Sequence, residues 1–289
     1  MRSISKLKGG FTFAMHGAGA YSGCVHTNTR EAFEYWRKRG VNVFEIDVGV
    51  DDNYEEGIAF AHLMNRDTDW ICKELNPRLV DPDYKINVIF AKSTSGLAIM
   101  RLSDIFMYLR EDPDLIIMFD FWEGWSYNDC CKLTKFIINE VGEETSLWDR
   151  FLIEVYTDDM IQAIRNTAPN ANMIFGESSL VNYSVRHIRL SGISFVSFPR
   201  YMARKNFTKF QEYVECGFGI FQLSKTNYRW KYWRDKGVNV NIVDARFDNV
   251  FQIIKHCILV TRQRINVLRV YVDYYGLRKL LKKIIKKIL

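Results

Sequence analysis

The sequence has few of the features that mark disordered, modular or membrane-spanning chains. Only five of its 289 residues are proline, and no low-complexity tract or linker-like stretch interrupts it, so we expect an ordered chain. No apolar run is long enough to cross a bilayer, and the basic N-terminus, MRSISKLKGG, is not followed by the apolar stretch of a signal peptide. We therefore expect neither a membrane span nor a secretory signal.

Several cofactor and metal motifs are also missing. The six cysteines show neither C-x-x-C pairing nor a zinc-like spacing with histidine, which favours reduced thiols in a cytoplasmic protein. The glycine-rich stretch HGAGAYSG, residues 16–23, fits neither G-x-G-x-x-G nor G-x-x-x-x-G-K-[ST]. A nucleotide-binding α/β enzyme is therefore disfavoured.

The excess of positive charge is confined to one end of the chain. The formal net charge is +6, and the last thirteen residues, LRKLLKKIIKKIL, contain six Lys and Arg and no acid. Residues 1–276 are therefore formally neutral. A broad nucleic-acid-binding surface would need basic residues across the body, so we expect no nucleic-acid partner.

Short apolar runs alternate with helical patterns along most of the chain, and 48% hydrophobic residues provide material for a large core. Helices are predicted at 28–40, with Asn28 as N-cap, and at 158–168, 206–217 and 246–260. Strand-like runs occur at 11–17, 41–48, 115–121, 151–156, 172–177, 192–198, 219–224 and 240–244. Eight such units predict an α/β fold, a (β/α)8 TIM barrel, with a doubly wound open sheet as the alternative. Residues 49–101, with a short strand at 57–63, are predicted to be an insertion after the second strand.

Two acids, Glu45 and Asp47, interrupt the apolar run VFEIDVGV at residues 43–50. Residues two apart on a strand share a face, so both carboxylates point one way while the apolar residues between them point toward covering helices. Both acids lie near the C-terminal end of the strand. In a barrel that end forms the mouth where active sites are found.

Other polar side chains fall at corresponding positions. His16 ends the first strand and His62 ends the inserted strand, while Asp120, Glu154 and Asp244 lie in or at the ends of later strands. Clustered carboxylates repel one another and are costly to bury, and a divalent cation is the simplest compensation. Oxygen ligands favour a hard ion such as Mg²⁺ or Ca²⁺. Pairing of the acids with an arginine remains the alternative.

The combination of these elements resembles a known family. MHGAG…YSGCVHTNTREAFEYWRKRGVNVFEIDVGV…GIAFAHL, within residues 15–63, resembles the N-terminal signature of the glycerophosphodiester phosphodiesterases, which belong to the phospholipase C-like phosphodiesterase barrels. Residues 101–121 and 153–177 are also similar to later parts of that fold. The resemblance extends, with decreasing strength, over residues 11–245.

The resemblance implies roles for the residues that match it. His16 and His62 would be the general acid and base, and Glu45, Asp47 and Asp120 would hold one divalent cation. The substrate would be a glycerophosphodiester: a deacylated phospholipid, a lysophospholipid or a glycerol-phosphate glycan. Attack by water or by a hydroxyl of the substrate, which would give a cyclic phosphate, both remain open.

Two positions depart from the family pattern. Gly17 stands where many members have arginine, and Trp122 stands where many have lysine. Lys225 or Arg200 are candidates to replace the lost positive charge. A catalytically weakened barrel that acts as a membrane-associated scaffold is therefore the alternative function. The residues predicted to contact substrate are Glu154, Lys225, Trp122 and Asp244.

The C-terminal sequence GLRKLLKKIIKKIL, residues 276–289, has leucines and isoleucines at helical spacing and basic residues on the opposite face. This pattern is typical of a helix that lies on an anionic membrane. Packing on the barrel or on a second copy of the chain is the alternative. The residues predicted to contact the membrane are Leu277, Leu281, Lys282, Ile284 and Ile288.

The sequence thus predicts a barrel over residues 1–264 and a basic amphipathic tail over 265–289. We expect a metal-dependent phosphoric diester hydrolase of lipid metabolism, peripheral on the inner face of the membrane, with a homo-oligomer left open.

Overall fold

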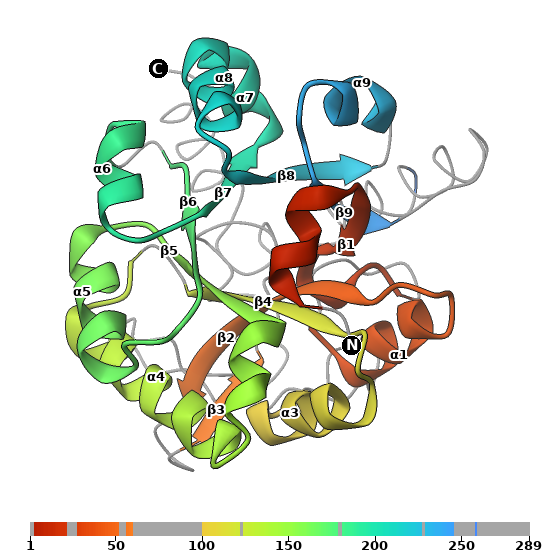
Figure 1. Ribbon diagram of the computed structural model, residues 1–289. Helices are drawn as coiled ribbons and strands as arrows, with labels where there is room; N and C mark the ends of the chain where they lie inside the picture. Colours follow the sequence, from red (N-terminus) through yellow and green to blue (C-terminus); the bar gives the residue numbers. More distant parts are fainter. Residues whose placement is uncertain are drawn as a thin grey trace, which may run out of the picture.

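A computed structural model describes residues 3–21, 28–51, 56–59, 100–121, 124–178, 181–226, 229–245 and 258. Eight parallel strands form a closed barrel in it, because β1 pairs with both β9 and β2 while the other strands follow in chain order (Figure 1). The predicted (β/α)8 barrel is confirmed, and the open-sheet alternative is wrong. The strands are β1 (Thr12–Met15), β2 (Val43–Asp51), β4 (Ile116–Phe121), β5 (Phe151–Val155), β6 (Met173–Gly176), β7 (Phe195–Pro199), β8 (Gly219–Thr226) and β9 (Val240–Ala245).

The predicted insertion, residues 49–101, contains a strand, β3 (Glu56–Ala59), which pairs antiparallel with the end of β2. The strand predicted at 57–63 is described only as far as Ala59. β2 itself continues to Asp51, three residues beyond its predicted end, because β3 provides a hydrogen-bonding partner there. Residues 60–99, the remainder of the insertion up to Met100, lie outside the described residues.

Helices cover the outside of the barrel (Figure 1). They are α1 (Arg30–Arg37), α3 (Leu102–Glu111), α4 (Tyr127–Val141), α5 (Asp158–Thr167), α6 (Val185–Leu190), α7 (Arg200–Lys205), α8 (Phe207–Glu215) and α9 (Trp230–Asp235). The hydroxyl groups of Ser126, Thr157 and Ser184 accept backbone N–H groups at the starts of α4, α5 and α6. The predicted helix at 246–260 lies outside the described residues, apart from Ile258. None of the described helices is both long and apolar enough to cross a lipid bilayer.

The prediction of Asn28 as the N-cap of the first helix is wrong. Thr29 caps α1 instead, and its hydroxyl accepts the backbone N–H of Ala32 at 3.4 Å. Asn28 lies inside the barrel mouth with a positive φ of 49°, and its side chain is used there.

Alternate residues of each strand divide between two apolar layers. Phe44, Ile46 and Val48 of β2 pack against the helices, as predicted. A second cluster fills the barrel interior, and a short 3-10 helix, η1 (Ile4–Gly9), adds Ile4 and Leu7 to it. These two side chains are 5% and 4% exposed, so η1 closes the N-terminal end of the barrel. The interior is therefore apolar at that end and polar at the other.

The three described cysteines, Cys130, Cys131 and Cys216, form no disulfide. Cys130 is buried in the helix layer, and burial raises the pKa of its thiol to about 12. It is therefore a packing residue with no thiolate character at neutral pH.

Candidate active site

The polar residues of the barrel gather at the C-terminal ends of the strands. Asp47 of β2 lies in register with Asp120 of β4, which in turn lies in register with Glu154 of β5. Parallel strands in register place such side chains next to one another on the inner face of the barrel. Asp120 and Glu154, together with Glu45, His16 and Tyr156, line a pocket whose open space, including its mouth, is about 370 Å³.

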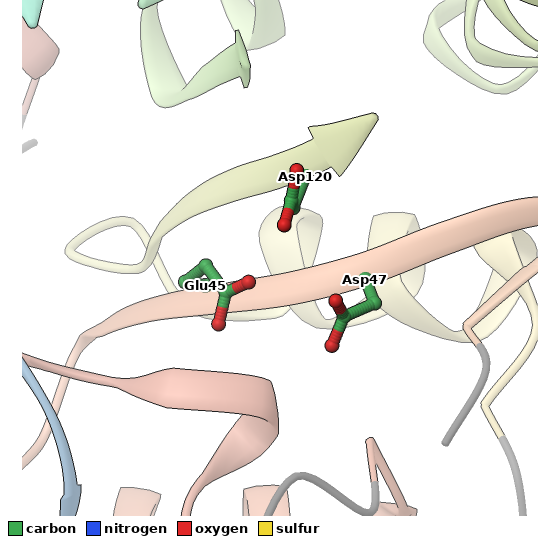
Figure 2. Close-up of side chains that lie close together, drawn as sticks. All are labelled: Glu45, Asp47 and Asp120. Atoms are coloured by element: carbon green, nitrogen blue, oxygen red, sulfur yellow. The ribbon is translucent and has the colours of Figure 1, made fainter. Parts of the chain in front are cut away.

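Glu45, Asp47 and Asp120 form an acidic cluster in this mouth. Each offers a carboxylate oxygen, and the three oxygens lie within 4.8 Å of one another. Figure 2 shows the two side chains from β2 and the one from β4 turned toward a shared space. Glu45 and Asp47 are only 2% and 4% exposed, so solvent screens their repulsion poorly.

The electrostatics of the cluster favour a bound cation. Burial, followed by the charges of Asp47 and Asp120, raises the pKa of Glu45 well above its usual value. Burial and the charges of Glu154 and Asp47 raise the pKa of Asp120 in the same way. A divalent cation would relieve the repulsion that these shifts report, and carboxylate oxygens are the ligands that Mg²⁺ and Ca²⁺ prefer.

A hydrogen-bonded network supports the cluster on the β5 side. The Tyr156 hydroxyl donates to Asp120 Oδ1 at 2.9 Å, and the Ser197 hydroxyl donates to Glu154 Oε1. Burial raises the pKa of Glu154 to about 7 and also raises the pKa of Tyr156, which therefore stays a neutral donor. Gly176 on β6 makes room for both side chains, because a Cβ there would lie 2.3 Å from the Tyr156 ring and 2.8 Å from Glu154 Oε1.

His16 lies at the edge of the same cluster. Its Nδ1 is 2.9 Å from Asp244 Oδ1, and its Nε2 is 3.9 Å from Glu45 Oε2. An ionised Asp244 can accept the Nδ1 proton, and Nε2 is the ring nitrogen directed toward the acidic cluster. Asp244 was predicted to contact substrate; its carboxylate contacts His16 here, and the contact with substrate stays a prediction.

The turn after β1 is bent by residues with positive φ. Gly17, Ala18 and Gly19 have φ angles of 53°, 63° and 90°, and the turn brings the Gly17 N–H to 2.5 Å from Glu45 Oε2. A Cβ at Gly19 would lie 2.4 Å from the ring of Trp36, so only glycine fits there. Gly17 stands at the position where many members of the resembled family have arginine. Its backbone N–H donates a hydrogen bond to Glu45 in the acidic cluster.

Asn28 orients the second acid of the β2 pair. Its Nδ2 donates to Asp47 Oδ2 at 2.6 Å, and its Oδ1 accepts the Asp47 backbone N–H at 3.3 Å. Asn28 is wholly buried, so its amide is a fixed part of the mouth. Its place in the HTNTREAF stretch, immediately before a helix, concealed this role, since asparagine is common at helix caps.

Three further residues of the site, one directly after β6 and two on α8, were not predicted from the sequence. Glu177, at the end of the β6 segment, lines the pocket and accepts the Tyr213 hydroxyl at 2.7 Å. Lys209 Nζ lies 2.7 Å from Glu177 Oε1, so this lysine forms an ion pair with an acid that lines the pocket. The position of Glu177 at a strand end was a usable signal. Lys209 and Tyr213 on α8 offered none, because they reach the pocket only through tertiary packing.

Most of the remaining predicted site residues lie outside the part of the chain that the structure describes. His62 and Trp122 lie outside the described residues, as do Leu277, Leu281, Lys282, Ile284 and Ile288. Lys225 belongs to β8, but its side chain is outside the described part. Arg200 begins α7, directly after Pro199, which lines the pocket.

Comparison with known proteins identifies structures that share this fold. No protein-family model matches the chain. No curated protein sequence matches it either. Solved structures do match, and several of them are glycerophosphodiester phosphodiesterases.

Three of these structures illustrate the likeness. A glycerophosphodiester phosphodiesterase from Parabacteroides distasonis has a TM-score of 0.60 and 12% identity, over 88% of this chain and 98% of its own. An Oleispira antarctica phosphodiesterase in complex with the product sn-glycerol-3-phosphate has a TM-score of 0.61 and 10% identity, over 81% and 92%. A Thermotoga maritima glycerophosphodiester phosphodiesterase has a TM-score of 0.56 and 15% identity, over 81% and 94%. At such identities the likeness concerns the fold, and this chain has the TIM-barrel fold of the glycerophosphodiester phosphodiesterases.

Proposed function

We propose that this protein is a metal-dependent phosphoric diester hydrolase that cleaves a glycerophosphodiester. The observation that carries the proposal is the position of His16 Nε2, 3.9 Å from Glu45 Oε2, beside three buried carboxylates in the mouth of the barrel. An imidazole beside a site suited to a divalent cation is an arrangement that supports phosphodiester cleavage. The shared fold with glycerophosphodiester phosphodiesterases supports the substrate class.

Each residue of the mouth has a part in the proposed chemistry. Glu45, Asp47 and Asp120 would hold one Mg²⁺ or Ca²⁺ ion, which would neutralise charge on the phosphate oxygens when bound. His16 transfers a proton at Nε2 while Asp244 holds the ring by Nδ1. His62 is proposed as the second acid or base on the strength of the family resemblance alone.

The test is the release of glycerol phosphate or free alcohol from soluble diesters such as glycerophosphocholine, glycerophosphoethanolamine and glycerophosphoglycerol. We expect release that needs added Mg²⁺ or Ca²⁺ and stops with a chelator. Absence of release from all three, together with no cation bound in calorimetry, contradicts the proposal. That result favours a scaffold barrel, the alternative raised by the missing cations at Gly17 and Trp122.

Tyr156→Phe is expected to weaken binding of the metal ion by about 10-fold to 100-fold, because the phenol orients the Asp120 carboxylate. Isothermal titration with Mg²⁺ or Ca²⁺ measures the effect without any substrate. Tyr127→Phe is the matched control, since Tyr127 on α4 is 37% exposed and its hydroxyl accepts a hydrogen bond from Asn166 at the surface. Equal affinities of the Tyr156→Phe variant and the wild type for the metal ion would show that Tyr156 does not support metal binding.

We also propose that residues 277–289 attach the protein to the cytoplasmic face of a membrane. Six basic residues there would each contribute about 1 kcal/mol near an anionic surface, in addition to the aliphatic stripe. Deleting these residues is expected to weaken binding to phosphatidylglycerol vesicles at least about 100-fold while turnover of a soluble diester persists. Unchanged sedimentation with vesicles after the deletion would argue instead for packing of the tail on protein.

A further inference from the structure

The neutral body of the protein is electrically polarised. Residues 102–167, from the start of α3 to the end of α5, contain fourteen Asp and Glu, of which Asp120 and Glu154 lie in the barrel mouth, against five Lys and Arg. Residues 200–236, from the start of α7 to just beyond α9, contain nine Lys and Arg against three Asp and Glu. Figure 1 shows α3 and α4 on one side of the barrel and α7, α8 and α9 on the opposite side. The zero net charge of the body therefore conceals an acidic side and a basic side.

The basic side also exposes large aromatic side chains. Tyr201 on α7 is 63% exposed and Tyr232 on α9 is 51% exposed, which places both among the few large apolar side chains that the described residues leave in solvent. Exposed lysines and an arginine accompany them on the same two helices and directly after α9. We name this surface the basic face and define it by Tyr201, Arg204, Lys205, Lys231, Tyr232 and Lys236.

The two helices of the basic face are joined through α8. Lys236 Nζ lies 5.9 Å from the ring of Tyr232 and 5.8 Å from the ring of Phe207, at the start of α8. The rings of Phe210 on α8 and Trp233 on α9 are 5.9 Å apart. At its other end α8 follows α7 after a single residue, so the basic face rests on one packed unit.

The basic face flanks the mouth of the pocket. Pro199 lines the pocket, and α7 begins at the next residue. Leu223 of β8 also lines the pocket, and α9 begins shortly after β8 ends at Thr226. A surface that docks against the basic face would therefore lie beside the pocket opening.

We propose that the basic face docks on an anionic phospholipid bilayer. Lysine and arginine attract the negatively charged headgroups, and exposed tyrosine is the side chain that partitions into the headgroup layer. The acidic side of the barrel, opposite the basic face, fixes the orientation because the same surface repels it. A bilayer is also the partner that fits the amphipathic basic sequence at the end of the chain, whereas the tail was the only lipid contact expected from the sequence.

The proposal is tested with the full-length chain and needs no turnover, so its outcome is independent of the enzymatic proposal. We expect the triple variant Lys205→Glu, Lys231→Glu, Lys236→Glu to bind vesicles of phosphatidylglycerol and phosphatidylcholine about 100-fold more weakly than the wild type. Co-sedimentation measures the partition coefficient, and vesicles of phosphatidylcholine alone give the background.

The matched control carries the same net charge at other places on the barrel: Lys38→Glu, Lys135→Glu and Arg186→Glu, three exposed residues at or on α1, α4 and α6. Because charges beyond a Debye length are screened, the control is expected to stay within roughly threefold of the wild type. Equal losses in the two variants would mean that only total charge matters, and would overturn the proposal.

Two further measurements do not depend on the triple variant folding well. Hydrogen exchange of the wild type on anionic vesicles is expected to slow in 200–205 and 230–236, and unchanged exchange there overturns the proposal. Tyr201→Ser with Tyr232→Ser, which leaves the charge unchanged, is expected to lower vesicle affinity about tenfold. Tighter binding to a DNA duplex than to vesicles, lost in the charge variants, would assign the face to nucleic acid and reject the bilayer.

Discussion

His16→Ala is expected to lower kcat/KM for a glycerophosphodiester by about 10²-fold to 10⁴-fold, the usual contribution of a positioned general acid or base. The imidazole is held at Nδ1 by Asp244 at 2.9 Å, so Nε2 has a fixed direction toward the acidic cluster. Alanine removes the only part of residue 16 that can transfer a proton. Release of glycerol phosphate, followed at saturating and at low diester concentrations, separates the loss in kcat from any change in KM.

The control for this result is another histidine that also pairs with an aspartate. His187 Nε2 lies 2.8 Å from Asp158 Oδ1, and the two side chains are 42% and 51% exposed on the outer surface. His187→Ala is therefore expected to leave turnover unchanged. A His16→Ala enzyme with activity within about threefold of the wild type would show that His16 transfers no proton in the rate-limiting step.

Asp244→Asn separates the positioning of His16 from its chemistry. Asparagine keeps the shape of the side chain but removes the negative charge beside Nδ1, so the imidazolium loses a stabilising partner. The limb of the pH–rate profile that His16 sets, acidic if it is the base and basic if it is the acid, is then expected to move to lower pH, with a smaller loss of rate than in His16→Ala.

The second large effect concerns stability in the absence of metal. Burial raises the pKa of Glu154 from 4.5 to about 7, so the folded protein holds a proton that the unfolded chain releases at lower pH. Stability is therefore greatest below the unfolded pKa and falls as the pH rises through the folded one, by about 3 kcal/mol between about pH 4 and about pH 8. The raised pKa values of Glu45 and Asp120 act in the same direction.

Urea melts in a chelator at several pH values measure this loss, and added Mg²⁺ or Ca²⁺ should reverse it. A cation binds the ionised carboxylates, so its stabilising effect is expected to be larger at about pH 8 than at about pH 5, and roughly 2.7 kcal/mol at one hundred times its Kd. Glu154→Gln, which cannot ionise, should flatten part of the pH dependence. Stability that rises over this range without metal, or that no divalent cation changes, would contradict the acidic cluster as a cation site.

The part of the site that followed from the sequence is the part set by strand geometry. Glu45 and Asp47 share a face because of the two-residue period of a strand, and Asp120 joins them because neighbouring parallel strands end together. His16 was found by the same argument, as a polar residue at a strand end. These rules depend only on local spacing, which a single sequence contains.

The parts that the sequence did not reveal depend on contacts between distant residues. Asn28 has the composition of a helix cap, and only the fold brings its amide to Asp47, nineteen positions away. Lys209 and Tyr213 reach Glu177 from α8, more than thirty positions along the chain. The separation of charge onto opposite sides of the barrel could likewise not be seen in the sequence, because the net charge of residues 1–276 is zero. It becomes visible only when the fold shows which helices are neighbours.

The closure of one end of the barrel by η1 has a kinetic consequence. Ile4 and Leu7 fill the interior at the end opposite the barrel mouth, so no molecule can pass along the barrel axis. Under the proposed function, a diester would have to enter by the end at which it reacts, and both fragments would have to leave by that same route. Whichever fragment stays longer therefore delays the next cycle, and the lifetime of that fragment sets an upper limit on turnover.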